Sequence, residues 1–425
     1  MTDSRIRGLY KLPVAERISR LEELGWLTPG DAGALKGGHQ VLSIGAADRM
    51  IENVIGVFGL PLAVAPNFLV NGRDCVVPLV VEEPSIVAGL SSAAALARAS
   101  GGFDVESSES LLTGQVHVTG IDDVDHAIAT LEQRKGGLID AANAVHPRLV
   151  ARGGGVRDIE FRLFELPRGD TAIAVHILVD TCDAMGANLV NTVCEALAPE
   201  IAAACSGEVA LRILSNLADR SLYTARARFA LPGDERDAII LANDIALADP
   251  YRAATHNKGV MNGVDAVAIA TGNDWRAIEA GVHAFAARTG QYRSLTNWSI
   301  ADDGQLLGEI TLPLKVGTVG GTLASNPAAA LGLALTGAQS ADELAGIMAA
   351  TGLAQNFAAL RALATSGIQA GHMKLHARSV AAAAGAGDDR FDAVVEKLVA
   401  SGEIKDWKAR EILADLQGAD AAEPQ

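Results

Sequence analysis

Two short polar segments interrupt a chain that is rich in apolar residues. THNKGVMNG at 255–263 supplies Lys258, and GNDW at 272–275 supplies Asp274. A lysine ammonium can stabilise negative charge that develops on a carbonyl oxygen, and a nearby carboxylate keeps that lysine charged. We expect Lys258 to be buried and to meet Asp274 in the folded chain. The pattern therefore predicts a site that stabilises an oxyanion.

Two further segments carry groups that suit proton transfer. VVEEPSIVAG places Glu82 and Glu83 after an apolar run, where desolvation raises a carboxyl pKa and favours a general acid. The alternative is that one glutamate of the pair simply faces water. HMKLHAR places His372 and His376 on one helical face. The segment AAAAGAGDD at 381–389, which follows, reads as a hinge. A lone histidine is more often structural than catalytic. A histidine just before a hinge is a better candidate for catalysis than a histidine elsewhere.

DAMGAN at 183–188 reads as the start of a helix directly after a strand. Asp183 can cap that helix, and Gly186 and Ala187 leave the backbone open to a ligand. A phosphate or ribose suits such a helix N-terminus, whereas the alternative is a tight packing turn. The sequence has no GxGxxG after a strand, no P-loop and no GxSxG elbow, which disfavours the common nucleotide folds and serine hydrolases.

The elements that must position these groups predict an α+β fold. Residues 111–217 alternate as β-α-β-β-α-β, which is the order of a ferredoxin-like domain. We expect it to be a small domain inserted in a large, mostly helical domain of residues 1–110 and 218–376. Ser85 is placed to cap a small-residue helix, with Pro84 just before it. Residues 377–425 form a C-terminal helical appendage, either a lid or a docked hairpin.

Composition limits the partners and the compartment. The formal charge of −16 argues against nucleic acid and against an anionic membrane surface. The four cysteines form no CxxC pair and have no histidine at a zinc-ligand spacing, so we expect free thiols and no metal. No apolar run reaches the ~20 residues of a membrane span, and the first residues do not resemble a signal peptide. We therefore expect a soluble, cytoplasmic protein.

Nine stretches together resemble the soluble, bacterial class (class II) of 3-hydroxy-3-methylglutaryl-coenzyme A (HMG-CoA) reductases. They occur in family order over nearly the whole chain. They are ENVIG at 52–56, VVEEPSIVAG at 80–89, RGGGVRDIE at 152–160, DAMGANLVNT at 183–192, RILSNLAD at 212–219, DPYRAATHNKGVMNG at 249–263, ATGNDWRAIEAG at 270–281, GTVGG at 317–321 and LHAR at 375–378.

The resemblance implies a reduction of HMG-CoA to mevalonate and coenzyme A (CoA), by two hydride transfers through mevaldyl-CoA and mevaldehyde. The catalytic residues that it implies are Glu83, Lys258, Asp274 and His376. The residues that it implies for binding HMG-CoA are Ser85, Arg252, Asn262, Asn216, Glu52 and Lys11. The residues that it implies for the nicotinamide dinucleotide are Asp183, Met185, Gly186, Ala187, Asn188 and His146.

The choice between NAD(H) and NADP(H) depends on His146. NAD-preferring relatives have an aspartate at this position, which contacts the ribose 2′-hydroxyl. A histidine here, with Arg148 and Arg152 near it in sequence, suits a 2′-phosphate instead. Likeness to catabolic relatives favours NAD(H), and we predict NAD(H).

The resemblance also implies a homodimer with active sites shared between subunits, and a higher oligomer remains open. It further implies that residues 377–425 are a mobile flap. Two other functions stay as alternatives: another enzyme that acts on CoA thioesters, and a catalytically inactive CoA-binding protein. The first would need a nucleophile near Lys258, and no cysteine or serine in these motifs suits that role.

Overall fold

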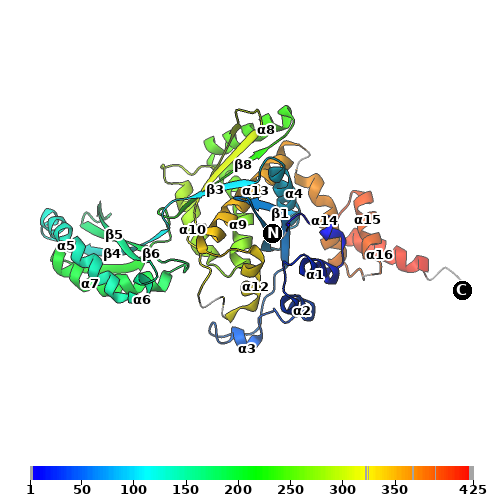
Figure 1. Ribbon diagram of the computed structural model, residues 1–425. Helices are drawn as coiled ribbons and strands as arrows, with labels where there is room; N and C mark the ends of the chain where they lie inside the picture. Colours follow the sequence, from blue (N-terminus) through cyan, green and yellow to red (C-terminus); the bar gives the residue numbers. More distant parts are fainter. Residues whose placement is uncertain (1–2, 321–322, 324, 366–367, 388, 421–425) are drawn as a thin grey trace.

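A computed structural model describes residues 3–320, 323, 325–365, 368–387 and 389–420, leaving aside the side chains of 368–375 and 418–420 (Figure 1). The chain forms two lobes, each with its own sheet, and a group of C-terminal helices. The small lobe lies to one side of the large lobe, and the C-terminal helices lie on the opposite side. The predicted α+β fold is confirmed.

The large lobe is built from segments on both sides of the small one. Its N-terminal elements are η1 (Leu9–Lys11), α1 (Val14–Glu23), α2 (Pro29–Gly37), α3 (Ile44–Ala47), β1 (Leu62–Val70), β2 (Arg73–Val80), α4 (Ile86–Ala99) and β3 (Phe103–Ser107). Its later elements are β8 (Leu222–Phe229), α8 (Gly233–Ala248), α9 (Pro250–Ala270), α10 (Trp275–Ala286), β9 (Thr296–Ile300), β10 (Leu306–Pro313), α12 (Pro327–Thr336) and α13 (Ala341–Ala364).

The large lobe is organised around a six-stranded sheet in the order β2-β1-β3-β8-β10-β9. Helices α4, α9 and α13 share one buried core with the sheet, and the helices near the N-terminus pack with α12 on the other face of β1 and β2. Strands β3 and β8 are antiparallel neighbours, with Ser107 paired to Tyr223, although the whole small lobe lies between them in sequence.

The small lobe contains β4 (Leu111–Thr119), α5 (Val124–Val145), α6 (Pro147–Val150), β5 (Gly155–Glu165), β6 (Thr171–Asp180), α7 (Ala187–Cys205) and β7 (Glu208–Leu214). Its antiparallel sheet has the order β5-β6-β4-β7. Helices α5 and α7 cover one face through a separate core. Apart from the short α6, this is the predicted β-α-β-β-α-β order with ferredoxin-like pairing.

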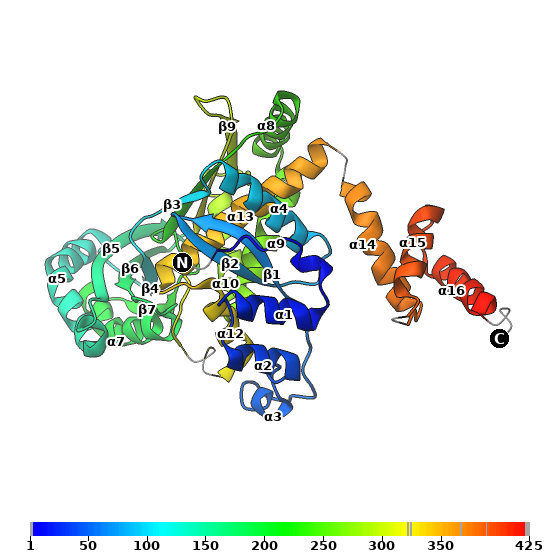
Figure 2. The same cartoon turned by 45° about the vertical axis from the view of Figure 1, so that its right-hand side comes forward.

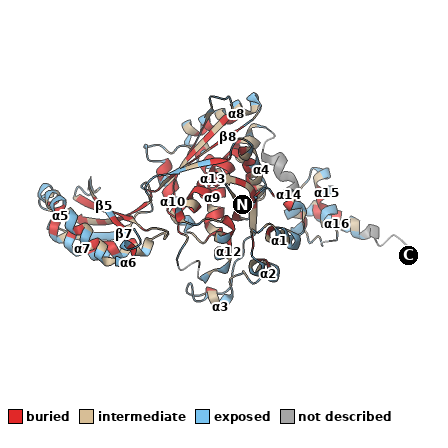
Figure 3. Ribbon diagram, viewed as in Figure 1, coloured by how far each residue is buried: buried red, intermediate tan, exposed pale blue. Residues whose placement is uncertain are grey.

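Small residues let the two central helices of the large lobe approach closely. Helix α13 is buried along most of its length, as the red ribbon at the centre of Figure 3 shows. A Cβ atom on Gly352 would lie 3.0 Å from the Val264 side chain, and one on Gly263 would lie 3.1 Å from the Thr351 carbonyl oxygen. Helix α9, which carries Lys258, is thereby held against α13 by backbone contact.

The C-terminal helices α14 (Ile368–Ala383), α15 (Phe391–Ser401) and α16 (Asp406–Asp420) form a small bundle with its own core. Figure 2 shows this bundle extending away from the large lobe. The Arg378 guanidinium pairs with Asp392 at 3.0 Å and stacks over Phe391, which ties α14 to α15. Within the described part of the chain, no helix has the length and apolar character to cross a membrane.

Candidate active site

Lys258 and Glu83 meet at the surface of the large lobe. Glu83 lies between the end of β2 and the start of α4, and Lys258 lies on α9. The ammonium Nζ donates to Glu83 Oε2 at 2.5 Å. The expectation that Lys258 is buried is wrong for the single chain, because its side chain is 58% exposed. The pair supplies a cation and a carboxyl group at one place, open to a ligand.

Ser85 follows Glu83 in a strained conformation. Its φ of 75° is left-handed, which is uncommon for a residue with a side chain and often marks a functional site. Ser85 is the N-cap of α4, but its hydroxyl makes no capping hydrogen bond, so the predicted capping role is wrong. The hydroxyl is left available beside Glu83.

Asp274 does not pair with Lys258 within the described chain. Its Oδ1 accepts from the Ala277 backbone N–H at 3.1 Å, so the carboxylate caps α10. The favourable interaction of a carboxylate with a helix N-terminus explains this preference. Helix α10 also touches the loop that carries Asn216, because a Cβ atom on Gly281 would lie 2.5 Å from the Asn216 carbonyl oxygen.

Helix α9 carries two more of the expected substrate-binding residues. Asn262 lies one turn beyond Lys258 and therefore on the same face. Arg252 lies near the start of the helix, and its Nη1 atom is buried without a hydrogen-bond partner among the described residues. Burial also lowers the pKa of this guanidinium. An unpartnered, buried guanidinium nitrogen suits a carboxylate ligand, which would satisfy it with two parallel hydrogen bonds.

His376 lies on α14, in the C-terminal bundle. Its side chain is exposed, whereas the next residue, Ala377, is fully buried in the core of that bundle. No contact joins His376 to Lys258 or Glu83 among the described side chains. The side chain of His372, the other histidine of the motif, lies outside the described set. His376 is therefore placed by the C-terminal bundle rather than by the large lobe.

The DAMGAN residues form the turn that leads into α7. Gly186 is the N-cap of this helix, with a φ of 93° and no side chain, so the backbone N–H groups that begin at Ala187 and Asn188 remain open. The predicted capping by Asp183 is wrong, because its Oδ1 accepts instead from the Ala341 N–H of the large lobe at 2.9 Å. An open helix N-terminus can receive a phosphate group.

His146 lies next to that same helix end. It is the residue between α5 and α6, and its Nε2 atom is 3.3 Å from the Leu189 carbonyl oxygen in the first turn of α7. The fold thus brings His146 to the DAMGAN turn across a long stretch of sequence. The expected dinucleotide-binding residues gather on one edge of the small lobe.

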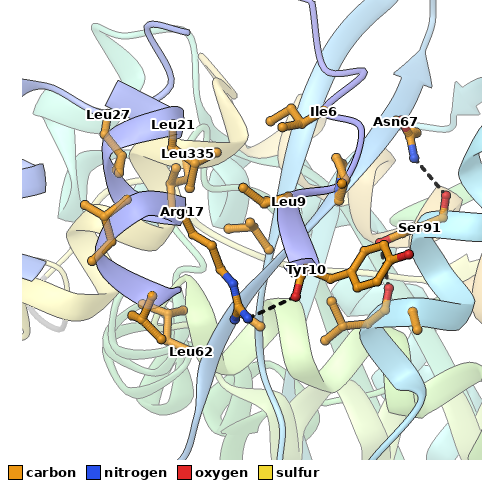
Figure 4. A pocket seen from close by; sticks show the side chains of 18 of the residues that line it. Ile6, Leu9, Tyr10, Arg17, Leu21, Leu27, Leu62, Asn67, Ser91 and Leu335 are labelled. Carbon is orange, nitrogen blue, oxygen red and sulfur yellow. Dashed lines mark hydrogen bonds between the residues drawn. The ribbon is translucent and has the colours of Figure 1, made fainter. Parts of the chain in front are cut away.

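A cavity of about 920 Å³ lies between the N-terminal helices, β1 and α4. Figure 4 shows Leu21 and Leu27 on one side of it and Asn67 and Ser91 on the other, with Tyr10 between them. Most of its wall is aliphatic. Lys11 is exposed at the end of η1 beside Tyr10, and Glu52 is exposed in the segment before β1. No hydrogen bond or ion pair joins these two side chains within the described part of the chain.

The sequence analysis did not single out Gln355. This side chain on α13 is only 5% exposed, and its Oε1 atom has no partner among the described residues. It lies against Gly263, the residue after Asn262. A buried side-chain oxygen that lacks a hydrogen-bond partner is uncommon in folded proteins. No motif in the sequence sets this glutamine apart.

A partly buried pair of carboxyl groups also lies between α9 and α10. Burial and the neighbouring Glu279 raise the pKa of Asp265, so that Asp265 holds a proton while Glu279 stays charged. His283 lies 2.5 Å from Glu279 and 2.7 Å from the Tyr292 hydroxyl.

Among the described residues, no group of three or more His, Cys, Asp or Glu side chains is arranged to hold a metal ion.

The variant Asp265→Asn should be more stable than the parent protein at neutral pH. In the unfolded chain this aspartate ionises above pH ~4, whereas the folded protein keeps the proton, so the parent loses stability as pH rises. Asparagine cannot ionise and can still donate to Glu279. We expect the free energy of unfolding to rise by at least about 1.4 kcal/mol at pH 8, which is the equivalent of one pKa unit, and by less at pH 5. Urea unfolding at both pH values tests this, and a gain independent of pH would contradict it.

Fold and site together define a class of protein: an α+β enzyme whose ammonium–carboxylate pair is suited to the reduction of a carbonyl group. Comparison with known proteins agrees. The model of the family "Hydroxymethylglutaryl-coenzyme A reductase" matches residues 13–377. The 3-hydroxy-3-methylglutaryl-coenzyme A reductase of Archaeoglobus fulgidus is 49% identical over 418 residues, which cover 97% of this chain and 95% of that protein.

Solved structures give the same result. An HMG-CoA reductase from Streptococcus pneumoniae superposes with a TM-score of 0.83 at 42% identity, over 96% of this chain and 99% of that one. Another structure, of the class II enzyme from the same organism bound to NADPH in open conformations, has a TM-score of 0.82 at 43% identity, over 84% and 99%. The chain belongs to the hydroxymethylglutaryl-coenzyme A reductase family, and it is an oxidoreductase.

Proposed function

We propose that this protein reduces HMG-CoA to mevalonate and CoA with two equivalents of a reduced nicotinamide dinucleotide. The observation that carries the proposal is the contact between Lys258 and Glu83 at the head of α4. It places an oxyanion-stabilising cation and a proton donor within reach of one carbonyl oxygen. The unpartnered Arg252 on the same helix supports it, because the hydroxymethylglutaryl group ends in a carboxylate.

The first half of the reaction converts the thioester to a hemithioacetal. A reduced nicotinamide dinucleotide bound at the small lobe would supply a hydride to the carbonyl carbon in each half. As the carbonyl electron pair moves to oxygen, the Lys258 ammonium stabilises the negative charge, and Glu83 gives that oxygen a proton to form mevaldyl-CoA. Asp274 keeps Lys258 charged and couples it to Glu83 when the complete site is assembled.

The second half releases CoA and forms the alcohol. Glu83 takes the proton back from the hemithioacetal oxygen, the carbon–sulfur bond breaks, and His376 protonates the departing thiolate. The aldehyde that remains, mevaldehyde, accepts the second hydride at the same carbon. Lys258 and Glu83 again stabilise and protonate the oxygen, which gives mevalonate.

We propose that the small lobe, residues 111–217, holds the dinucleotide at the DAMGAN turn. The N-terminus of α7, which has no side-chain cap, fits the pyrophosphate. His146 lies at the same place and can contact the ribose or its 2′-phosphate. NAD(H) remains our prediction, although the NADPH-bound relative favours the alternative. The ratio of kcat/KM for NADH and NADPH decides it.

We propose that the cavity between α4 and the N-terminal helices receives the pantetheine arm of CoA. Val87 and Ala88 line it directly after the segment that holds Glu83 and Ser85, so a thiol leaving that site enters the cavity. Its aliphatic wall suits the arm, and the cation of Lys11 suits the CoA phosphates. Glu52 belongs to the segment expected to border CoA. Isothermal titration of CoA into the parent protein and into Ser91→Trp, which narrows the cavity, tests this placement. Weaker CoA binding by the variant is expected.

We propose that two chains form a homodimer that completes the site. The segment 51–60 exposes a row of apolar side chains, among them Ile55 at 102% and Phe58 at 89%. Such a row marks a protein interface. In a single chain Lys258 is exposed and Asp274 does not lie beside it. This is expected of a site that a second chain completes. Light scattering should give twice the mass of the chain, and a purely monomeric, active enzyme would refute the shared site.

We further propose that residues 1–110 and 218–376 form the substrate-binding domain and that residues 377–425 close over it as a flap. The separate core of the C-terminal bundle supports a mobile flap, because the bundle can move without unfolding. Helix α14 begins at Ile368, so the part that moves includes His376 as well. Closure would bring His376 to the thiolate. Cross-linking of the bundle to the large lobe, with and without HMG-CoA, measures this closure.

The test of function is absorbance at 340 nm with mevalonate, CoA and oxidised NAD or NADP. We expect the dinucleotide to be reduced only when both mevalonate and CoA are present. An inactive CoA-binding protein would show no change while CoA still binds. Another CoA-thioester enzyme would instead release free thiol from HMG-CoA without consuming NADH or NADPH. Either outcome would overturn the proposal.

A further inference from the structure

The turn that leads to Asp274 is attached to a glycine of the GTVGG motif. Asn273 Oδ1 accepts from the Gly317 N–H at 2.7 Å, and Asn273 Nδ2 donates to the Gly317 carbonyl at 3.2 Å. Nδ2 also donates to the Thr271 hydroxyl at 3.0 Å. The Asn273 amide therefore binds both the backbone N–H and the backbone carbonyl of Gly317. Asn273 is the residue next to Asp274.

The same segment of the large lobe touches the DAMGAN turn of the small lobe. The Thr318 N–H donates to the Asp183 carbonyl at 2.9 Å, and Ala184 forms a parallel bridge with Val319. A Cβ atom on Gly317 would lie 2.6 Å from the Met185 nitrogen, so only glycine permits this approach. Residues 317–319 thus contact the proposed dinucleotide site on one side and Asn273 on the other.

Helix α10, which begins just after Asp274, lies on the side of the large lobe that faces the small lobe (Figure 1). Lys315, two residues before Gly317, is buried and donates to the Ser110 carbonyl at 3.0 Å, where the chain passes between the lobes. The 317–319 segment is therefore fixed at its start as well. Its position sets how the dinucleotide turn lies relative to Asp274.

We propose that Asn273 is a positioning residue, which through Gly317 holds the dinucleotide-binding turn in a fixed relation to Asp274. This inference rests on the proposed function. The side chain acts through other residues and not on the substrate, because both ends of its amide are already engaged by protein groups. Its loss should change the alignment for hydride transfer, which needs the reacting atoms at near-contact distance.

The experiment compares Asn273→Ala and Asn273→Asp with the parent enzyme. Both variants should lower kcat for HMG-CoA reduction, by about 10²-fold in the alanine variant, since a misplacement of about 1 Å can have that effect. The dissociation constants of HMG-CoA and of the dinucleotide, from titration calorimetry, should stay within about twofold, because Asn273 is not among the proposed ligand-binding residues. The aspartate variant keeps the shape and the bond from Gly317 N–H, so it remains informative if the alanine variant does not fold.

The matched control is Asn71→Ala. Asn71 makes the same pair of bonds to one residue, Val105, with distances of 2.7 Å and 3.0 Å, at an exposed turn outside the proposed site. Alanine there also strains a backbone with a φ of 48°, so its effect on stability should be no smaller. Loss of kcat in the Asn273 variants with normal kcat in Asn71→Ala supports positioning. Unchanged kcat, or a loss explained by weaker binding or by less folded protein in both, overturns it. An inactive parent enzyme would refute the proposed function instead.

Discussion

The variant Lys258→Ala should lose most of its turnover and keep its ligands. Removal of one group that stabilises an oxyanion lowers kcat by about 10²–10³-fold in comparable sites, and here the same group is proposed to serve both hydride transfers. HMG-CoA and CoA should still bind, because the charge that Lys258 stabilises develops only in the transition state. Steady-state kinetics and titration calorimetry measure the two effects separately.

Lys135→Ala is the matched control for that variant. It removes another ammonium–carboxylate pair, between Lys135 and Asp158 at 2.7 Å, on the small lobe and outside the proposed site. We expect normal turnover, since an exposed ion pair contributes little to stability. Near-normal kcat in Lys258→Ala would remove this lysine from the mechanism, whatever the control shows.

The variant Arg252→Met should bind HMG-CoA poorly and yet be more stable. Methionine keeps an unbranched chain in the packed space but removes the guanidinium. If that group pairs with the substrate carboxylate, its loss costs about 2 kcal/mol or more of binding, which is about a 30-fold increase in KM. Without ligand, however, a buried nitrogen that lacks a partner destabilises the fold, so we expect the free energy of unfolding to rise by about 1 kcal/mol.

The control for Arg252→Met is Arg361→Met on α13. Arg361 already has a partner, Glu235 at 2.5 Å, and it lies outside the proposed site. Its loss should lower stability and leave KM unchanged, which is the opposite pattern. A stability loss in Arg252→Met together with a normal KM would show that Arg252 has only a structural role.

The sequence was sufficient to predict the small lobe, because its elements alternate clearly. Period-two strands and long amphipathic helices follow one another there, and one face of the sheet is open. The central strands of the large lobe were not predicted. The strand segments β1 and β2 have buried side chains on both faces, so they read as continuous apolar runs without a period.

The candidate site was only partly predictable for a different reason. The carboxyl group of Glu83 and the ammonium group of Lys258 indicated the chemistry of the site, and the motifs indicated the family. The left-handed backbone of Ser85 and the attachment of Asn273 to Gly317 depend on contacts between distant segments, which no local pattern records. The sequence also did not show that the Lys258 side chain is 58% exposed in the single chain, because that exposure depends on which distant segments lie around it.

The pairing of β3 with β8 has a consequence for how such an enzyme can evolve. The two strands form an antiparallel hairpin in which the small lobe takes the place of the turn, with Ser107 opposite Tyr223 at its base. A domain attached in this way can be exchanged or remodelled as a unit, since its two attachment points are neighbours and the parent sheet keeps its ladder either way. If the small lobe holds the dinucleotide as proposed, grafting a relative's insert would change the dinucleotide preference and leave the large lobe untouched.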